Sequence, residues 1–477
     1  MTPARSVHSL RIPAVVAVSS GALALVLASG CGPPSGPIDA AIDSGPADAG
    51  PLPGSELPPL WTVRAPGISV DVTREPYGFV VRNAAGDDVV HTAGRGGPGE
   101  GYSSVAWTTG TTRWRPNAVS RGYSNFTATL DPWRDDWIVV AARESEGGLE
   151  LTLQHGRDGA QRMTVNHRVY DTSLRVEARV AGGEARAWEA AFATPPDEAF
   201  LGFGERFNRT NQRGIDVYNW AEEGGIGAGE GALAGPENPR PNGQAMSYYP
   251  VPFFLSSRGY GFWLDTTWRS EFNLATLHAD AWRAWHIGPS LAYEIYLPRA
   301  DDVRPWPYQL IDRFTQTTGR PMIPPAWTFG PRRRVGRGSM QHGVSEVQAM
   351  RDLDLAVTAV DDAVHFLPAG SHVGREPALT AWTTDARRLG YRVCGYYNSL
   401  LSSAPDNPIR AEVDQALQNR WVLRRRDGTP SPVFLISGSP LTVYQIDFSS
   451  RDATRWFQST LSWALDLGYS GWMYDFG

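Results

Sequence analysis

The chain has 477 residues, and its 44 basic and 50 acidic residues give a formal net charge of −6. A chain of this length is too long for one small core, so it predicts more than one domain. A nucleic-acid partner requires a basic surface, and the negative charge argues against one.

The first segment, residues 1–31, has the composition of a signal peptide. Arg5 and Arg11 supply positive charge, and the apolar run from Ile12 to Leu27 is too short to span a bilayer comfortably. Small residues then lead into Cys31, which resembles a bacterial lipobox whose cysteine becomes acylated. We therefore expect an exported protein on the periplasmic or outer-membrane face, held to the membrane by a lipid on Cys31. The alternative is ordinary cleavage that leaves Cys31 as a thiol.

Residues 32–59 are rich in Pro, Gly, Ala and Asp and predict a disordered linker, because they cannot bury enough apolar surface to offset the entropy of ordering. Cysteine is scarce, since Cys31 and Cys394 are the only two, and no Cys/His cluster has zinc spacing. There is neither a phosphate-binding loop nor a dinucleotide fingerprint. We expect no metal and no cofactor, and we expect Cys394 to lie in the core.

Residues 60–320 read as β-structure. Leu174, Val176 and Ala178 alternate with charged residues, which is the period of a strand with one solvated face. Turn signals recur at short intervals along the segment. The pattern predicts an antiparallel β-sandwich.

Residues 321–477 alternate between strands and helices, which predicts parallel β/α units. The expected strands are Ala326–Gly330, Ala363–Leu367, Tyr391–Tyr397 and Ser470–Tyr474. The expected helices are Ser345–Leu355, Thr380–Leu389 and Asp452–Leu467. Four strands are half of an eight-stranded (β/α)8 TIM barrel, so we expect a partial catalytic barrel here.

Several segments resemble glycoside hydrolase family 31, whose members cleave α-linked sugars. They are, in family order, Phe200–Phe207, Phe253–Asp265, Pro324–Gly330, Gln445–Ser449 and Gly471–Gly477. The resemblance implies a galactose-mutarotase-like β-sandwich followed by the first half of a TIM barrel. It also implies a retaining α-glycosidase that needs no cofactor and acts on an α-linked glycoside or oligosaccharide.

The last of these segments carries the candidate nucleophile, Asp475. Active sites of parallel barrels lie at the carboxyl ends of the strands, and Asp475 closes an apolar strand. Retaining glycosidases use a carboxylate to attack the anomeric carbon and a second one as acid/base. The resemblance implies the nucleophile role for Asp475 and places the acid/base beyond Gly477, so we expect this chain alone to be inactive. A helix cap is the alternative role for Asp475.

Four further residues are candidates for substrate binding. Glu205 lies in a glycine-rich loop, where it either lines a sugar subsite or holds the loop. Tyr396 and Asn398 end the third expected strand, and Asn398 bonds either a sugar hydroxyl or a neighbouring loop. Arg375 is a candidate for an anionic sugar, because guanidinium binds oxyanions by a two-pronged geometry.

One departure from the family pattern, at the second expected strand, leaves a second function open. The second expected strand ends without the usual aspartate, and Asp361 and Asp362 precede it. The segment Trp220–Gly227 looks like a feature of the sulfoquinovosidase branch, but the sulfonate grip of that branch is absent. The alternative function is a non-catalytic surface carbohydrate-binding lipoprotein with a degenerate barrel.

Overall fold

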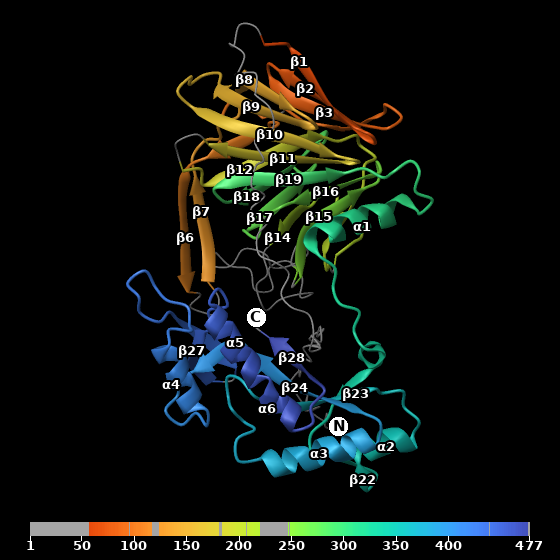
Figure 1. The fold of residues 1–477 in the computed structure, drawn as a ribbon, viewed down its shortest axis with the longest axis vertical. Helices are drawn as coiled ribbons and strands as arrows, with labels where there is room; N and C mark the ends of the chain where they lie inside the picture. Colours follow the sequence, from red (N-terminus) through yellow and green to blue (C-terminus); the bar gives the residue numbers. More distant parts are fainter. Residues whose placement is uncertain are drawn as a thin grey trace, which may run out of the picture. The chain divides into compact units, whose positions relative to one another are not determined.

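The computed structural model describes residues 57–94, 96–116, 124–180, 184–206, 208–219, 247, 249–437 and 439–475. They form two compact units that divide between Pro321 and Met322 (Figure 1). The predicted signal peptide lies outside the described residues, as does the predicted linker up to residue 56.

The first unit contains three antiparallel sheets and a hairpin (Figure 1). The smallest of the three sheets is β1 (Leu60–Ala65), β2 (Ile68–Arg74), β3 (Tyr77–Asn83) and β4 (Asp88–His91). The largest runs β13 (Phe200–Gly204), β15 (Pro250–Ser256), β16 (Tyr260–Leu264), β19 (Ser290–Tyr296), β11 (Ser173–Val180), β10 (Arg162–Tyr170), β9 (Gly148–His155) and β8 (Trp137–Ser145). The third runs β14 (Asp216–Asn219), β17 (Ser270–Leu274), β18 (Ala281–Ile287), β12 (Ala187–Ala193) and β5 (Ala106–Thr108). The hairpin is β6 (Gly110–Pro116) with β7 (Ser124–Leu130).

The two larger sheets pack face to face around an aromatic centre. Phe192 of β12 stacks on Trp282 of β18 with ring centroids 4.5 Å apart. The same tryptophan meets Phe254 and Phe262 of the largest sheet edge-on, at 5.2 and 5.0 Å. These four rings are fully buried, which removes a large apolar surface from water. The predicted antiparallel sandwich is confirmed.

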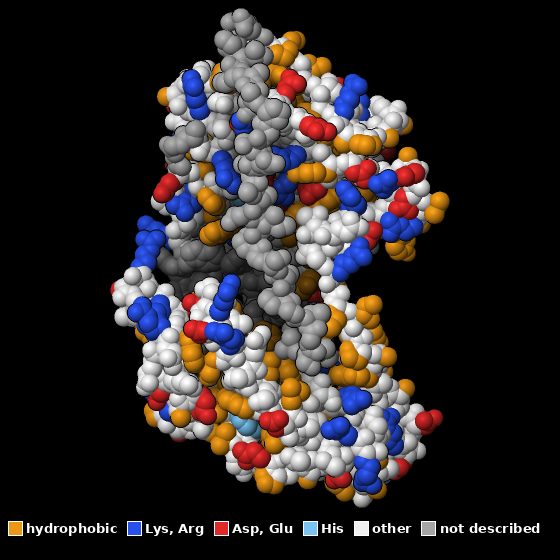
Figure 2. All heavy atoms as spheres, in the orientation of Figure 1, with side chains coloured by type: hydrophobic (Ala, Val, Ile, Leu, Met, Phe, Trp, Pro, Cys, Tyr) orange, Lys and Arg blue, Asp and Glu red, His pale blue; other side chains and the backbone are white. Residues whose placement is uncertain are grey.

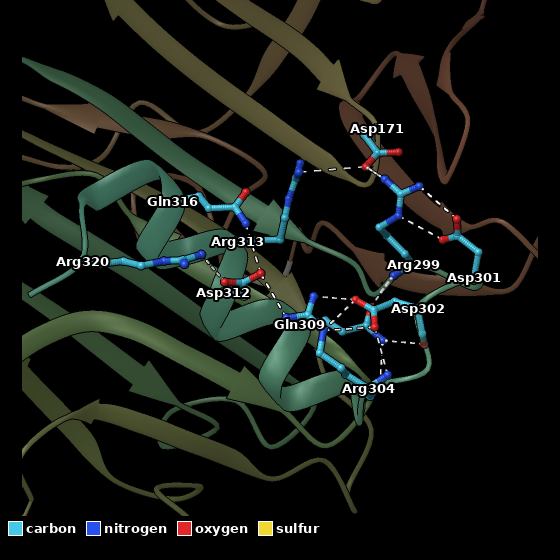
Figure 3. A network of polar contacts seen from close by, with 10 residues as sticks. All are labelled: Asp171, Arg299, Asp301, Asp302, Arg304, Gln309, Asp312, Arg313, Gln316 and Arg320. Carbon is cyan, nitrogen blue, oxygen red and sulfur yellow. Dashed lines mark hydrogen bonds and ion pairs between the residues drawn. The ribbon is translucent and has the colours of Figure 1, made fainter. Parts of the chain in front are cut away.

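Helix α1 (Trp306–Thr318) closes the first unit and packs on β16 and β19. Its buried face presents Leu310 and Phe314, and the Phe314 ring stacks on Phe253 at 4.2 Å. Before the helix, Arg299 pairs with both Asp171 and Asp301 (Figure 3).

Figure 3 also shows how polar groups hold the start of α1. The buried Gln309 amide accepts from the Arg299 N–H at 2.8 Å and donates to the Arg304 carbonyl at 2.8 Å. Arg304 pairs with Asp302 and Asp312, and Arg320 also pairs with Asp312. Because these contacts satisfy polar groups around the first turn, they tie the loop 298–305 to the helix.

On the surface of the sandwich unit that Figure 2 shows, basic and acidic side chains are interspersed. Many of the basic residues are in ion pairs, as in Arg82 with Asp88 and Arg175 with Asp265. The face of the sandwich unit in this view therefore does not concentrate one sign of charge.

The second unit contains a parallel sheet whose strands follow chain order: β20 (Arg332–Arg334), β23 (Ala359–His365), β24 (Arg392–Asn398) and β28 (Gly471–Asp475). The remaining strands are β21 (Met340–Gln341) with β22 (Val344–Ser345), and β25 (Leu400–Ser402) with β27 (Ser439–Gln445) and β26 (Pro432–Ser437). The helices are α2 (Glu346–Asp352), α3 (Glu376–Arg388), α4 (Arg410–Gln418), α5 (Arg451–Thr460) and α6 (Ser462–Asp466). The predicted alternation of parallel strands with helices is confirmed.

One face of this parallel sheet packs against helices. Val364, Tyr397 and Trp472 belong to one buried cluster with Leu379 of α3 and Phe457 of α5. Side chains alternate between the two faces of a strand, so the residues between these positions lie on the opposite face. We call that opposite face the open face of the sheet.

The first barrel strand was predicted wrongly. Residues Ala326–Phe329 form a short 3-10 turn, and the strand comes later, at Arg332–Arg334. The Thr358 hydroxyl donates to the Trp327 carbonyl in this turn at 2.8 Å. The arginine run that follows the expected strand is therefore the strand itself.

The second strand begins earlier than predicted and contains both aspartates. Asp362 is buried on the helix-packed side, where it pairs with Arg337 at 3.2 Å and accepts from the Tyr469 hydroxyl at 2.8 Å. Asp361 pairs with Arg332 of β20 on the open face. Asp362 is the buried one of the two acids, and its two partners offset the cost of taking its charge out of water.

Candidate active site

Asp475 is the last described residue of β28, on the open face of the parallel sheet. It lies opposite Asn398 in the register, and Met473 lies opposite Tyr396. Because β24 and β28 are parallel, their carboxyl ends meet at one edge of the sheet. This is the edge at which parallel α/β sheets and barrels bind their ligands.

A phenol contacts the carboxylate of Asp475 directly. The Tyr396 hydroxyl donates a hydrogen bond to Oδ2 of Asp475 at 2.8 Å. The ring of Tyr396 stacks on the imidazole of His365, with centroids 4.1 Å apart and planes inclined by 19°. His365 is paired with Tyr396 in the register, so three adjacent strands contribute one residue each to the cluster. We call Asp475, Tyr396 and His365 the strand-end cluster.

The backbone of His365 is held by a hydroxyl on the loop after the strand. Ser371 Oγ accepts from the His365 N–H at 2.9 Å and donates to the His365 carbonyl at 3.1 Å. Burial lowers the pKa of His365, the nearby Arg334 lowers it further, and Asp475 acts in the opposite direction. The neutral imidazole is therefore favoured at this position.

The arginines of β20 divide between the two faces. Arg332 and Arg334 lie on the open face, where Arg332 pairs with Asp361. Arg333 lies on the other face and pairs with Glu346 of α2 at 2.9 Å. Arg334 is exposed at the carboxyl end of β20, so it brings a positive charge to the same edge as the strand-end cluster.

The opposite face fixes the strands that carry the cluster. Phe366 stacks on Tyr397 with centroids 4.9 Å apart and nearly parallel planes. The Tyr397 hydroxyl donates to the Thr460 carbonyl of α5 at 2.7 Å. Both residues directly follow cluster members in sequence, so the two stacked rings join β23 and β24 on the face opposite His365 and Tyr396.

The other predicted site residues lie in different settings. Asn398 is fully buried, and its amide oxygen accepts from the Leu400 N–H at 2.9 Å, so a sugar contact there stays a prediction. Arg375 is exposed at the start of α3. Glu205 is exposed in the sandwich unit, where its N–H donates to the Tyr249 carbonyl at 3.0 Å. Cys394 is buried as expected, and burial raises its pKa to about 11.

Some predictions lie outside the described residues, namely lipidation of Cys31 and the segment Trp220–Gly227. Within the described ranges, no group of three or more His, Cys, Asp or Glu side chains is arranged to hold a metal ion. None of the helices described is both long enough and apolar enough to cross a membrane.

The sequence did not single out His365 as a site residue. Its one signal was the period of two along β23, which places His365 on the same face as Asp361. The register with Tyr396 decides whether the two rings meet, and a parallel register depends on long-range pairing that a local pattern does not contain.

Comparison with known proteins agrees with this fold. Residues 129–273 match the family described as glycosyl hydrolase 31 N-terminal galactose mutarotase-like domain. An α-xylosidase of Lactiplantibacillus pentosus is 25% identical over 71% of this chain and 42% of its own length. An α-glucosidase of Bacillus thermoamyloliquefaciens is 21% identical over 70% of this chain and 41% of its own length.

Solved structures give the same result at lower identity. A family 31 sulfoquinovosidase from E. rectale, in complex with an aza-sugar inhibitor, superimposes with a TM-score of 0.65 at 16% identity. The match covers 87% of this chain and 59% of that one. A cycloalternan-forming enzyme from Listeria monocytogenes reaches a TM-score of 0.52 at 16% identity over 85% of this chain and 42% of that one.

The family match and the shared fold indicate a galactose-mutarotase-like sandwich of the kind found in glycoside hydrolase family 31. Residues 129–273 match the N-terminal domain of glycoside hydrolase family 31, and most of the chain is similar in sequence to proteins named as an α-xylosidase and an α-glucosidase. The chain spans less than half the length of the curated relatives it matches.

Proposed function

We propose that the protein carrying this chain is a retaining α-glycosidase and that Asp475 is its nucleophile. The observation that carries the proposal is the position of Asp475, on the open face and at the carboxyl end of a parallel strand. The names of the relatives, an α-xylosidase and an α-glucosidase, agree with α-linked glycosides as substrates. The proposal also takes the four parallel strands as the first four of a (β/α)8 barrel.

The reaction has two steps. An oxygen of the Asp475 carboxylate bonds to the anomeric carbon while the bond from that carbon to the leaving oxygen breaks. A second carboxyl group protonates the leaving oxygen, and in the next step it takes a proton from the water that releases the sugar. In this proposal the acid/base is a carboxyl group outside the described residues.

The test is hydrolysis of aryl α-glycosides by the natural protein, expressed from its whole reading frame, and by its Asp475→Ala variant. We expect turnover by the natural protein and a loss of at least about 1,000-fold in the variant, since the nucleophile carries the covalent step. Asp361→Ala is a matched control, because Asp361 lies on the same face but is paired with Arg332. Equal activity of the Asp475→Ala variant and the natural protein would contradict the proposal.

A second candidate function is a surface carbohydrate-binding lipoprotein. The observation that favours it is the end of β23, which continues into Phe366 and Leu367 rather than a carboxylate. Binding of oligosaccharides without turnover by the natural protein, unchanged in Asp475→Ala, supports this function instead.

A further inference from the structure

Two ring side chains, Tyr396 of β24 and His365 of β23, connect Asp475 to the neighbouring strands. The Tyr396 hydroxyl donates a hydrogen bond to Asp475, and the His365 ring stacks on the Tyr396 ring. An ionised carboxylate only accepts hydrogen bonds, so the phenol is the donor in this pair. Each of the three residues comes from a different strand, and the strands are adjacent.

We infer that Tyr396 is a positioning residue for Asp475 and that His365 holds Tyr396 in place, an inference that rests on the proposed function. A carboxylate turns about the bond to its side chain, and a hydrogen bond to one oxygen fixes that rotation. Attack on the anomeric carbon requires an oxygen in line with the breaking bond, and misorientation of a reacting group costs rate. Tyr396 thereby holds the carboxylate in one orientation before substrate arrives.

The stacked imidazole of His365 restricts rotation of the Tyr396 ring. Tyr396 is only half buried, so one part of its side chain faces solvent and the stacked ring covers another. His365 covers one side of the ring at 4.1 Å, and the Ser371 hydroxyl clamps the His365 backbone at both its N–H and its carbonyl. The charged groups that act on His365 are Arg334 and Asp475, and burial together with Arg334 favours the neutral ring. A neutral ring stacks without placing a second cation beside the nucleophile.

The alternative role for Tyr396 is direct contact with the sugar, as the sequence suggested. The two roles separate in kinetics. A residue that binds substrate equally in ground and transition states raises KM when it is removed, whereas a positioning residue lowers the rate of the chemical step.

The experiment uses a 5-fluoro-α-glycosyl fluoride as the probe and the natural protein as the enzyme. An Asp475 oxygen bonds to the anomeric carbon while the carbon–fluorine bond breaks and fluoride leaves with the bonding pair. Fluoride needs no proton to leave, so the labelling rate reports the nucleophile without the acid/base. The maximal labelling rate and the half-saturating probe concentration are measured separately, by intact-protein mass spectrometry.

We expect Tyr396→Phe to lower the maximal labelling rate by about 10- to 100-fold, the range for a hydrogen bond to a charged group. The half-saturating concentration should stay within about twofold of its original value, since substrate binding is not affected. Tyr397→Phe is the matched control: it removes a hydroxyl from the next residue of the same strand, on the face that packs against α5. It should leave the maximal labelling rate unchanged.

His365 is tested by two substitutions of opposite character. His365→Ala removes the stacked ring and should lower the maximal labelling rate, while His365→Phe restores a flat ring and should recover most of it. If His365→Phe is as slow as His365→Ala, stacking is not the function of His365. If Tyr396→Phe changes only the half-saturating concentration, Tyr396 binds substrate and the inference is overturned.

A readout without turnover separates this inference from the proposed function. Crystal structures of the natural protein and of Tyr396→Phe report the orientation of the Asp475 carboxylate directly. One orientation in the natural protein and a rotated or divided one in the variant support positioning even if no probe reacts. The same orientation in both overturns the inference, whereas a natural protein that the probe does not label overturns the proposed function.

Discussion

At the scale of single residues, the strand-end cluster couples one acid, one phenol and one imidazole. The coupling is electrostatic as well as geometric, because Asp475 and Arg334 act on His365 in opposite directions. His365 therefore serves as a reporter of the charges around it, and its titration is measurable by NMR.

Removing either charge should move the His365 titration in a defined direction. Asp475→Asn removes the anion that raises the pKa of His365, so this pKa should fall further below its ordinary value. Arg334→Gln removes the cation that lowers it, so the pKa of His365 should rise. Arg333→Gln is the control, because Arg333 pairs with Glu346 on the other face. Shifts of the same sign in Asp475→Asn and Arg334→Gln would contradict the arrangement.

At the scale of elements, helix α1 depends on a narrow buried face. Leu310 is fully buried between the helix and the sandwich, while its neighbour Ile311 is 45% exposed. Leu310→Ala should lower the free energy of unfolding of the sandwich unit by about 2 to 5 kcal/mol, the cost of a cavity in a core. Ile311→Ala should change it by less than about 0.5 kcal/mol.

Urea unfolding followed by tryptophan fluorescence measures both variants. The two residues are adjacent and lose similar atoms, so the difference between them reports burial rather than helix propensity. Equal losses in the two variants would mean that α1 does not dock on the sheet through Leu310.

Elements with a regular alternation of apolar and polar residues, or with a bounded apolar run, were predictable from the sequence. β11 alternates buried and solvated side chains, and its buried residues Leu174, Val176 and Ala178 are those the pattern named. β24 and β28 were predicted within two residues of their observed ends, because both are apolar runs bounded by polar residues.

Elements decided by long-range contacts were not predictable. The hairpin of β26 and β27 and helix α4 gave no distinct local signal and were missed. β20 consists of three arginines, and its ion pair from Arg332 to Asp361 of β23 is a long-range contact that a local pattern does not contain. For the site, the sequence placed Asp475 and Tyr396 at strand ends, but it did not contain the hydrogen bond between them or the stack on His365.

At the scale of the whole molecule, two buried histidines make the sandwich sensitive to acid. Burial lowers the pKa of His167 and of His286 to about 4. Each must be neutral in the folded state, whereas each has an ordinary pKa in the unfolded chain. Their contribution is fully present above pH 6.5 and is lost as the pH falls from 6.5 towards 4.

Urea unfolding at a series of pH values measures this contribution. The slope of unfolding free energy against pH reports how many more protons the unfolded chain binds than the folded one. Replacing His167 with Gln should reduce this number by about one between pH 6.5 and pH 4. Replacing both histidines should reduce it by about two protons. Burial raises the pKa of Glu189 to about 7, so this residue changes the slope in the opposite sense. The slope of each histidine variant is therefore compared with the slope of the natural protein. An unchanged slope in His167→Gln would show that this histidine is not buried in neutral form.

The proposed membrane attachment depends on Cys31, outside the described residues. Cys31→Ala should move the protein from the detergent phase to the aqueous phase in a detergent partition, because lipid chains on that cysteine provide the attachment. Cys394→Ala, which removes the other cysteine of the chain, should leave the partition unchanged. Continued partition of Cys31→Ala into detergent would exclude Cys31 as the anchor.

Covalent labelling tests most directly whether Asp475 is the nucleophile. The natural protein is treated with a 5-fluoro-α-glycosyl fluoride, digested and sequenced by mass spectrometry. We predict one added glycosyl group, on Asp475, and no labelling of Asp475→Asn. A glycosyl group on another carboxylate, or an unlabelled protein that still hydrolyses α-glycosides, would contradict the assignment of Asp475 as the nucleophile.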